Sequence, residues 1–245
     1  MIELFDSLIN KRLLTRKVPD SIRNIDMLNT LLDISEESTG EFDKLKSNDL
    51  YLASNDTTSA TLEWAMAELL YNPEALSKAK AELKQIIGKG NAVVESDIDR
   101  LPYLQATFRL HPPVPLLFPC KAGADVEIQG FTVPKGAQVL VNIWAIGKDA
   151  SIWEHPNAFK PERFMGSEID VKGRNFELIL FGAGRRMCPG LPLALRMLHL
   201  MLGSLIHTFD WKVEGGFKPK DIYFEEKFGL TLQKAKPLRA IPIMV

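Results

Sequence analysis

Apolar and charged side chains alternate at helical spacing through the first part of the chain. Residues 2–14 and 24–34 each carry apolar positions three and four residues apart with charges between them, which predicts two amphipathic helices. A longer helix is predicted over 49–71. A further helix is predicted over 73–88, because Pro73 suits the first helical position and a glycine ends the pattern.

The pattern changes in the middle of the chain. PYLQATFRLH, residues 102–111, predicts a short helix that the following double proline halts. Residues 126–147, VEIQGFTVPKGAQVLVNIWAIG, combine β-branched side chains with glycine turn signals, so we expect two or three strands there. Residues 148–189 are rich in loop signals, and residues 227–245 predict a final hairpin. The fold class is therefore expected to be mainly α with small β-sheets.

The most apolar segment is LPLALRMLHLMLGSLIHTF, residues 191–209. Its length alone is compatible with a transmembrane span. Arg196, His199 and His207 interrupt the run, however, and ionisable side chains are costly inside a bilayer. We therefore predict a buried core helix and no membrane span in this chain. The first segment, MIELFDSLINKRLLTRK, has charges between its apolar residues and does not have the pattern of a signal peptide.

The composition of the chain restricts the possible functions less than its pattern of apolar and polar residues does. The 245 residues include 30 Lys and Arg against 31 Asp and Glu, and this formal net charge of −1 gives no indication of nucleic-acid binding. Two cysteines, Cys120 and Cys188, are too few for a disulfide framework. Neither they nor the four histidines have the spacing of a zinc site. A reducing compartment is the simplest expectation.

One stretch, FGAGRRMCPG, places a cysteine among glycines, arginines and a proline directly before the apolar helix. A phosphate-binding loop is one interpretation, because glycines and arginines before a helix can hold an anion. The spacing argues against it, since the dinucleotide pattern needs a third glycine where the chain has Met187. A second interpretation is an inert buried cysteine, as most free cysteines are.

The residues around Cys188 favour a third interpretation. Gly184 and Gly190 allow the backbone to fold around the sulfur and a large flat ligand to approach it. The following helix begins beside the cysteine, and the positive end of a helix stabilises a thiolate. Arg186 can pair with an anionic group of the same ligand. A thiolate with an arginine for carboxylates suits haem, in which cysteine ligation favours O–O cleavage.

Four stretches together resemble the cytochrome P450 monooxygenases. The pattern FxxGxRxCxG within residues 181–190 is similar to the haem-ligand signature of that family. ASNDTT (53–58) resembles the oxygen-activating segment of the long central helix, and TFRLHPP (107–113) resembles the end of the Glu-x-x-Arg helix. FKPERF (159–164) resembles the Pro-Glu-Arg-Phe segment. The resemblance covers essentially all 245 residues and is strongest to plant geraniol 8-hydroxylase-like terpenoid hydroxylases.

The resemblance implies the C-terminal half of the cytochrome P450 fold, as a single partial domain over residues 1–245. Its expected parts are a helical region over 1–121, a β-rich region over 122–147, the haem-ligand loop and following helix over 175–209, and a C-terminal hairpin over 210–245. The implied cofactor is haem b with its iron.

The same resemblance implies roles for particular residues of the haem loop. Cys188 is implied to be the axial thiolate ligand of the haem iron, and Arg186 to be a partner of a haem propionate. Phe181, Gly184 and Gly190 are implied to complete the cofactor-binding loop.

Two further pairs receive roles from the resemblance. Asp56 and Thr57 are implied to relay protons for O–O cleavage inside a mostly dry pocket. Without the resemblance, such a polar pair on a helix more often faces solvent or bonds its own backbone. Arg109 and Arg163 are implied to belong to a buried structural charge network.

The implied activity is insertion of one oxygen atom from O2 into a small lipophilic, terpenoid-type substrate. An NADPH-dependent cytochrome reductase is the implied electron donor, and no nucleic-acid partner is expected. The candidates for the surface to which the reductase docks are four basic residues, Lys172, Arg174, Arg185 and Arg196, although surface basic residues usually have no specific role. The resemblance implies the cytosolic face of the endoplasmic reticulum membrane. Because the chain lacks the family's anchor, a cytosolic location stays open.

The chain also departs from the family pattern. Full-length members are roughly twice as long, so the N-terminal helices of the fold are expected to be missing. Ala106 stands where the family has a glutamate three residues before Arg109, and removing a carboxylate from a buried network costs roughly 3–5 kcal/mol. Glu162 is a candidate to compensate. Ser54 replaces a glycine, and Cys120 replaces an arginine for a haem propionate. A non-catalytic truncated member with weak or no haem binding is therefore the alternative hypothesis.

Overall fold

The computed structural model describes residues 11, 13–16, 47–88, 90–100, 109–216 and 218–244. They divide into a first unit, Met1–Asp56, and a second unit, Thr57–Val245. The described residues of the first unit are all helical. The helix predicted over 24–34 lies outside the described residues, as does most of the one predicted over 2–14.

The α-helices are α3 (Ser47–Tyr71), α4 (Pro73–Ile87), α6 (Ile143–Gly147) and α7 (Leu191–Thr208). The 3₁₀ helices are η1 (Glu95–Arg100), η3 (Pro161–Phe164), η4 (Phe176–Leu178), η5 (Gly184–Arg186), η6 (Glu214–Gly216) and η7 (Pro219–Asp221). The strands are β1 (Cys120–Lys121), β2 (Val126–Ile128), β3 (Phe131–Val133), β4 (Gln138–Val139), β5 (Phe209–Val213), β6 (Glu226–Lys227), β7 (Gln233–Lys234) and β8 (Ala240–Met244). They form four antiparallel pairs, β1–β4, β2–β3, β5–β8 and β6–β7.

Helix α3 is apolar around most of its circumference in its second half, which is typical of a helix buried on all sides. Trp64 and Leu69 have exposed fractions of 2% and 0%. The helix ends at Tyr71 because Pro73 cannot continue it and instead occupies the first turn of α4. Asn72 directly precedes α4, but its side-chain amide donates back to Glu68 O (2.8 Å) and does not cap the new helix.

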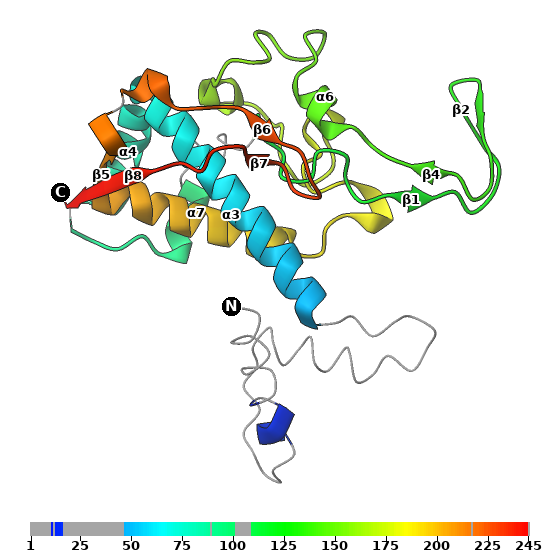
Figure 1. Cartoon of the computed structure of the whole chain (residues 1–245), viewed down its shortest axis with the longest axis horizontal. Coiled ribbons are helices and arrows are strands. Elements are labelled where there is room, and N and C mark those ends of the chain that lie inside the picture. The colour runs from blue at the N-terminus through cyan, green and yellow to red at the C-terminus, as the bar shows by residue number, and fades with distance from the viewer. Residues whose placement is uncertain are drawn as a thin grey trace. The chain divides into compact units, whose positions relative to one another are not determined.

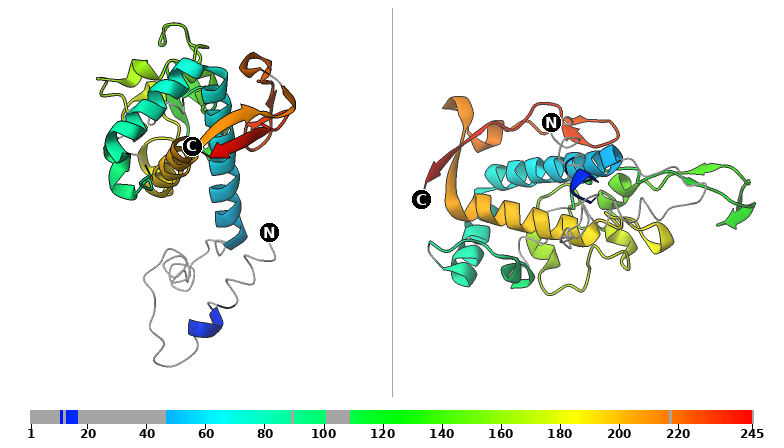
Figure 2. Two further views of the ribbon diagram at one scale, coloured as in Figure 1. Left: turned by 90° about the vertical axis from the view of Figure 1, so that its left-hand side faces the viewer. Right: turned by 90° about the horizontal axis from the view of Figure 1, so that it is seen from below.

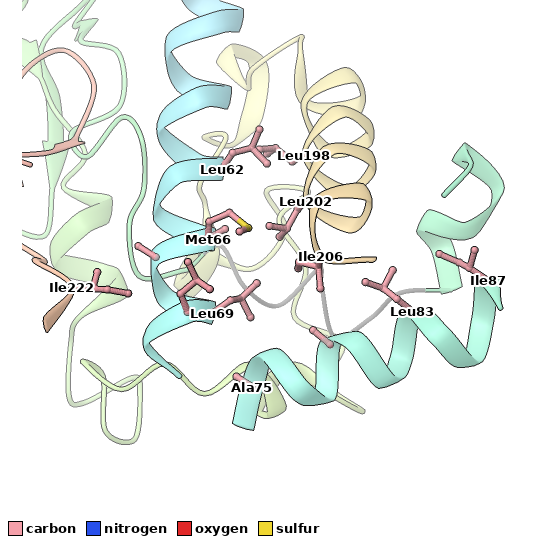
Figure 3. Close-up of a cluster of buried hydrophobic side chains, with 14 residues drawn as sticks. Leu62, Met66, Leu69, Ala75, Leu83, Ile87, Leu198, Leu202, Ile206 and Ile222 are labelled. Carbon is pink, nitrogen blue, oxygen red and sulfur yellow. The ribbon is translucent and has the colours of Figure 1, made fainter. Parts of the chain in front are cut away.

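The core lies where α3, α4 and α7 meet, and Figure 3 shows their side chains interdigitating. Leu198, Leu202 and Ile206 of α7 are buried at helical spacing and face Leu62 and Met66 of α3. Full burial of one such side chain contributes roughly 1.5–3 kcal/mol. By length and composition alone, α7 is also the one helix in the described ranges that is apolar enough to cross a membrane.

In the second unit, α7 runs beside α3, and β5–β8 and the β2–β3 hairpin lie at opposite ends (Figures 1 and 2). Two local predictions are corrected. Residues 143–147, expected within the β-rich region, form helix α6, whose first turn is capped by Asn142 Oδ1 accepting from Ala145 N (2.9 Å). The tail predicted to form a hairpin over 227–245 does contain the short antiparallel pair β6–β7, but its last strand, β8, pairs with β5, from Phe209↔Met244 to Val213↔Ala240. Most of the helix predicted over 102–111 lies outside the described residues, and residues 109–111 form a bend.

Candidate functional site

The cysteine loop, residues 181–190, is closed by its own backbone. Cys188 N donates to Phe181 O (2.9 Å), and Met187 N donates to Gly184 O (3.2 Å). Gly184 has φ +65, a conformation that side chains rarely adopt, and a Cβ there would meet nothing within 4 Å. Glycine is therefore needed at this position for backbone conformation, and the space beside it is open.

Cys188 lies exposed at the end of this loop, directly before α7. A Cβ placed on Gly190 would lie 3.7 Å from the Cys188 sulfur, so Gly190 leaves the near side of the sulfur uncovered. Gly190 O accepts the first helical bond, from Ala194 N (2.8 Å), and Pro192 stands in the first turn. The amide groups of that turn supply positive potential close to the sulfur.

Gly173 positions the loop, and sequence reasoning did not identify it. Its φ is +77, and a Cβ there would lie 2.9 Å from Gly182 O and 3.1 Å from Met187 Sδ. Any larger residue would therefore push the cysteine loop away. Gly173 lies in a stretch that is already rich in loop signals, so the sequence around it contains no pattern that predicts this contact.

The basic residues near Cys188 are on the surface. Arg186 is exposed in η5 and forms no ion pair with any residue that the structure describes. Arg174 contacts Asp170 (Nη2–Oδ2, 3.3 Å), and Arg196 contacts Glu95 (Nε–Oε1, 3.0 Å). Lys172 and Arg185 are exposed as well. Because exposed ion pairs contribute little, these side chains are free to exchange partners.

Asp56 and Thr57 are consecutive, half-buried residues of α3. Asp56 ends the first unit and Thr57 begins the second. Thr57 O accepts a hydrogen bond from Thr61 Oγ1 (2.8 Å), one helical turn later. The role of the pair as a proton relay stays a prediction.

Arg109 and Arg163 do come together, around one indole ring. Arg109 is 4% exposed, and the central guanidinium carbons of Arg109 and Arg163 lie 5.0 and 5.7 Å from the centroid of Trp153. Burial, followed by the positive charge of Arg163, lowers the pKa of Arg109 to about 10, against the opposing effect of Glu68. Glu162 forms an ion pair with Lys78 of α4, so compensation of the two arginines by Glu162 stays a prediction.

A second charged cluster surrounds His111, and no motif in the sequence predicts it. Its ring stacks on Trp64 (centroids 3.9 Å apart, planes 6° apart). His111 Nε2 lies 2.8 Å from Glu68 Oε1, and Nδ1 lies 3.4 Å from Glu226 Oε1, an ion-pair contact longer than an ordinary hydrogen bond. Lys148 Nζ also contacts Glu226 (3.1 Å).

This second cluster perturbs Glu226. Burial on its own raises the pKa of Glu226, but the contacts with His111, Lys148 and Trp144 outweigh it and lower the pKa to about 2. The cluster joins four parts of the chain that are separate in sequence: α3, the segment after Arg109, α6 with its end at Lys148, and the β6–β7 hairpin. It has no role in the site predicted from the sequence.

Comparison with known proteins gives a consistent result. Residues 1–239 match the family model described as Cytochrome P450. The chain is 57% identical over 249 residues to a geraniol 8-hydroxylase of Swertia mussotii, covering 98% of this chain and 50% of the relative. It is 56% identical over 250 residues to a geraniol 8-hydroxylase of Catharanthus roseus, with coverages of 99% and 50%. The chain thus spans about half the length of the curated relatives it matches.

A solved structure agrees with these relatives in fold. A zebra fish cytochrome P450 in a structure with progesterone superimposes with a TM-score of 0.80 at 30% identity, covering 98% of this chain and 57% of that one.

Proposed function

The chain belongs to the cytochrome P450 family, and from that premise we propose that it supplies the haem-thiolate site of a monooxygenase acting on a small lipophilic substrate. The observation that carries the proposal is the cysteine loop. Its sulfur is exposed, held by the Phe181–Cys188 backbone bond and placed before the N-terminus of α7. These are the surroundings that favour a thiolate ligand.

The residues present fit a large flat cofactor carrying carboxylates. The space beside Gly184 is open, Gly190 leaves the sulfur accessible, and Arg186 is exposed and has no described ion-pair partner. Cys188 would hold the haem iron, and Arg186 would pair with a propionate. When bound, haem b supplies the activation of O2 and the transfer of one oxygen atom to the substrate.

The other residues of the chain would manage protons, water and electrons. Asp56 and Thr57 on α3 would hold and pass protons toward the reacting oxygen, a task for which a carboxylate and a hydroxyl on one helix are suited. The exposed basic residues near Cys188 would attract the acidic face of an NADPH-dependent reductase at long range. The family resemblance further implies a location at the cytosolic face of the endoplasmic reticulum membrane.

The substrate class is proposed from the relatives alone. Two of them are named geraniol 8-hydroxylase, and another, of Persicaria hydropiper, is named drimenol monooxygenase, with 51% identity. A terpenoid alcohol is therefore the first substrate to test.

The test is product formation from geraniol by the haem-loaded chain with reductase and NADPH. Activity that is lost in Cys188→Ala and kept in Cys120→Ala would support the proposal, since both cysteines are exposed and only Cys188 lies in the loop. Equal activity in the two variants would contradict the role of Cys188.

A second candidate function is a non-catalytic chain that binds haem weakly or not at all. It is favoured by the half-length match and by the Arg109–Arg163 pair, which lacks a described carboxylate partner. Turnover of any terpenoid by the chain with reductase would exclude this candidate.

A further inference from the structure

Two guanidinium groups share one small space in the second unit. Arg109 Nη2 and Arg163 Nη2 each lie 3.5 Å from the same acceptor, Ala158 O, and both groups lie over the ring of Trp153. A contact of 3.5 Å is at the limit of a hydrogen bond, so neither donor is well satisfied there. Like charges brought this close repel each other, and the burial of Arg109 weakens the screening of this repulsion by water.

Neutral acceptors surround the pair. Arg109 donates to Gly147 O and Pro156 O, and Arg163 donates to the backbone carbonyls of Glu154, His155 and Lys160. No carboxylate of the described residues lies within ion-pair distance of either guanidinium. Burial and then the charge of Arg163 lower the pKa of Arg109 against the opposing effect of Glu68, which agrees with a cation that has no direct ion-pair partner.

Two further observations indicate a ligand. Trp153 is 6% exposed, and its Nε1–H has no hydrogen-bond partner among the described residues, although a buried donor normally finds one. A hollow of about 10 Å³ also lies against Arg109, the member of the pair that lines it together with Leu110, Ala158, Phe159, Lys160, Pro161 and Phe164. That volume corresponds to roughly one water-sized group.

We propose that the Arg109–Arg163 pair is a binding site for a small carboxylate anion. A carboxylate matches the paired N–H donors of a guanidinium, and one of its oxygens has the size of the hollow. Binding reduces the repulsion between the arginines and gives the guanidinium groups a charged acceptor in addition to their neutral carbonyl acceptors. The site is distinct from the cysteine loop and does not require haem, so its failure and that of the proposed monooxygenase activity are separable.

The experiment uses formate as the probe and the melting temperature of the full 245-residue chain as the readout. Formate is titrated against chloride at constant ionic strength, without haem. The expected result is a saturable rise in melting temperature with formate that chloride and the bulkier pivalate do not give. Equal effects of formate, chloride and pivalate would overturn the proposal.

Variants locate the site. Arg163→Gln is expected to weaken the apparent formate affinity roughly tenfold or more, because a hydrogen bond to a charged group is lost. Arg239→Gln removes an equally charged but exposed arginine, paired with Glu214, and is expected to leave the affinity unchanged. If Arg163→Gln does not fold, Lys160→Gln at the wall of the hollow is expected to weaken formate about threefold. Unchanged affinity in a folded Arg163→Gln or Lys160→Gln would contradict the assignment.

Discussion

Two charged clusters, one around Arg109 and one around His111, lie close together in the sequence and differ in how their positive charge is balanced. Around His111, the side chains of Glu68, Glu226 and Lys148 form a mixed network in which carboxylates face an imidazole and a lysine. Around Arg109, two residues earlier, the guanidinium groups bind backbone carbonyls and stack on Trp153. The His111 cluster connects parts of the chain that are far apart in sequence. The Arg109 cluster holds positive charge to which an anion can bind.

This difference teaches that burial of charge alone does not indicate a stabilising network. Breaking a buried ion pair lowers the stability of the protein because one charge is left buried without its partner. Buried cations without an ion-pair partner already lower the stability of the intact protein. Mutations in the balanced cluster should therefore destabilise the protein, and an added carboxylate in the other cluster should stabilise it.

The largest effect is expected from breaking the balanced cluster. Glu68 is 7% exposed and faces His111, so Glu68→Gln should lower the free energy of unfolding by roughly 3 kcal/mol. Urea unfolding followed by circular dichroism measures it. Glu74→Gln, at an exposed position in the first turn of α4, is the matched control and should change stability by less than about 0.5 kcal/mol. Equal losses in both variants would contradict the account.

The next largest effect is a loss of folding stability at acidic pH. The pKa of Glu226 is about 2 in the folded protein against an ordinary 4.5, so its ionised form stabilises the fold above pH 4.5. That stability is lost as the pH falls from 4.5 toward 2, because the folded carboxylate must then be protonated. The loss should amount to about 2 kcal/mol. Glu226→Gln should remove most of this slope, and an unchanged slope would show that other groups cause it.

A smaller effect of opposite sign is expected when the other cluster gains a carboxylate. Ala106→Glu places one three residues before Arg109 and should raise the free energy of unfolding by about 1 kcal/mol. Ala106→Gln has nearly the same shape without the charge and is the control. In Ala106→Glu the effect of formate on melting should also disappear. Stabilisation by both variants alike would indicate packing and not charge.

The smallest effect is expected at the cysteine loop, which belongs to neither cluster. Cys188 is exposed and its sulfur makes no described hydrogen bond, so Cys188→Ala should change stability by less than about 0.5 kcal/mol. Gly173→Ala, in contrast, should disturb the loop, because its Cβ would lie 2.9 Å from Gly182 O. Similar melting temperatures for these two variants would argue against tight packing between Gly173 and the loop.

The long helices could be predicted from the sequence, whereas the pairing of strands that lie far apart in the chain could not. The ends of α3 and α7 agree with the prediction within two residues, because proline and apolar periodicity are local signals. The pairing of β8 with β5 has no local signal, since the two strands are brought together across the intervening tail. Residues 143–147 contain β-branched side chains, yet the Asn142 cap and tertiary context make them helical.

The site was predicted in part for the same reason. The cysteine loop could be inferred because its residues are consecutive, and the convergence of Arg109 and Arg163 followed from the family resemblance. The His111 cluster and Gly173 could not be inferred, since their partners lie far away in sequence and no motif joins them.

The central claim is that Cys188 can ligate haem iron as a thiolate in this chain. The most direct measurement is the absorption spectrum of the purified chain after haem addition, in its ferrous, CO-bound form. The account predicts a strongly red-shifted Soret band that Cys120→Ala retains and Cys188→Ala loses. Absence of the shifted band in the unmodified chain, or its persistence in Cys188→Ala, would contradict the account.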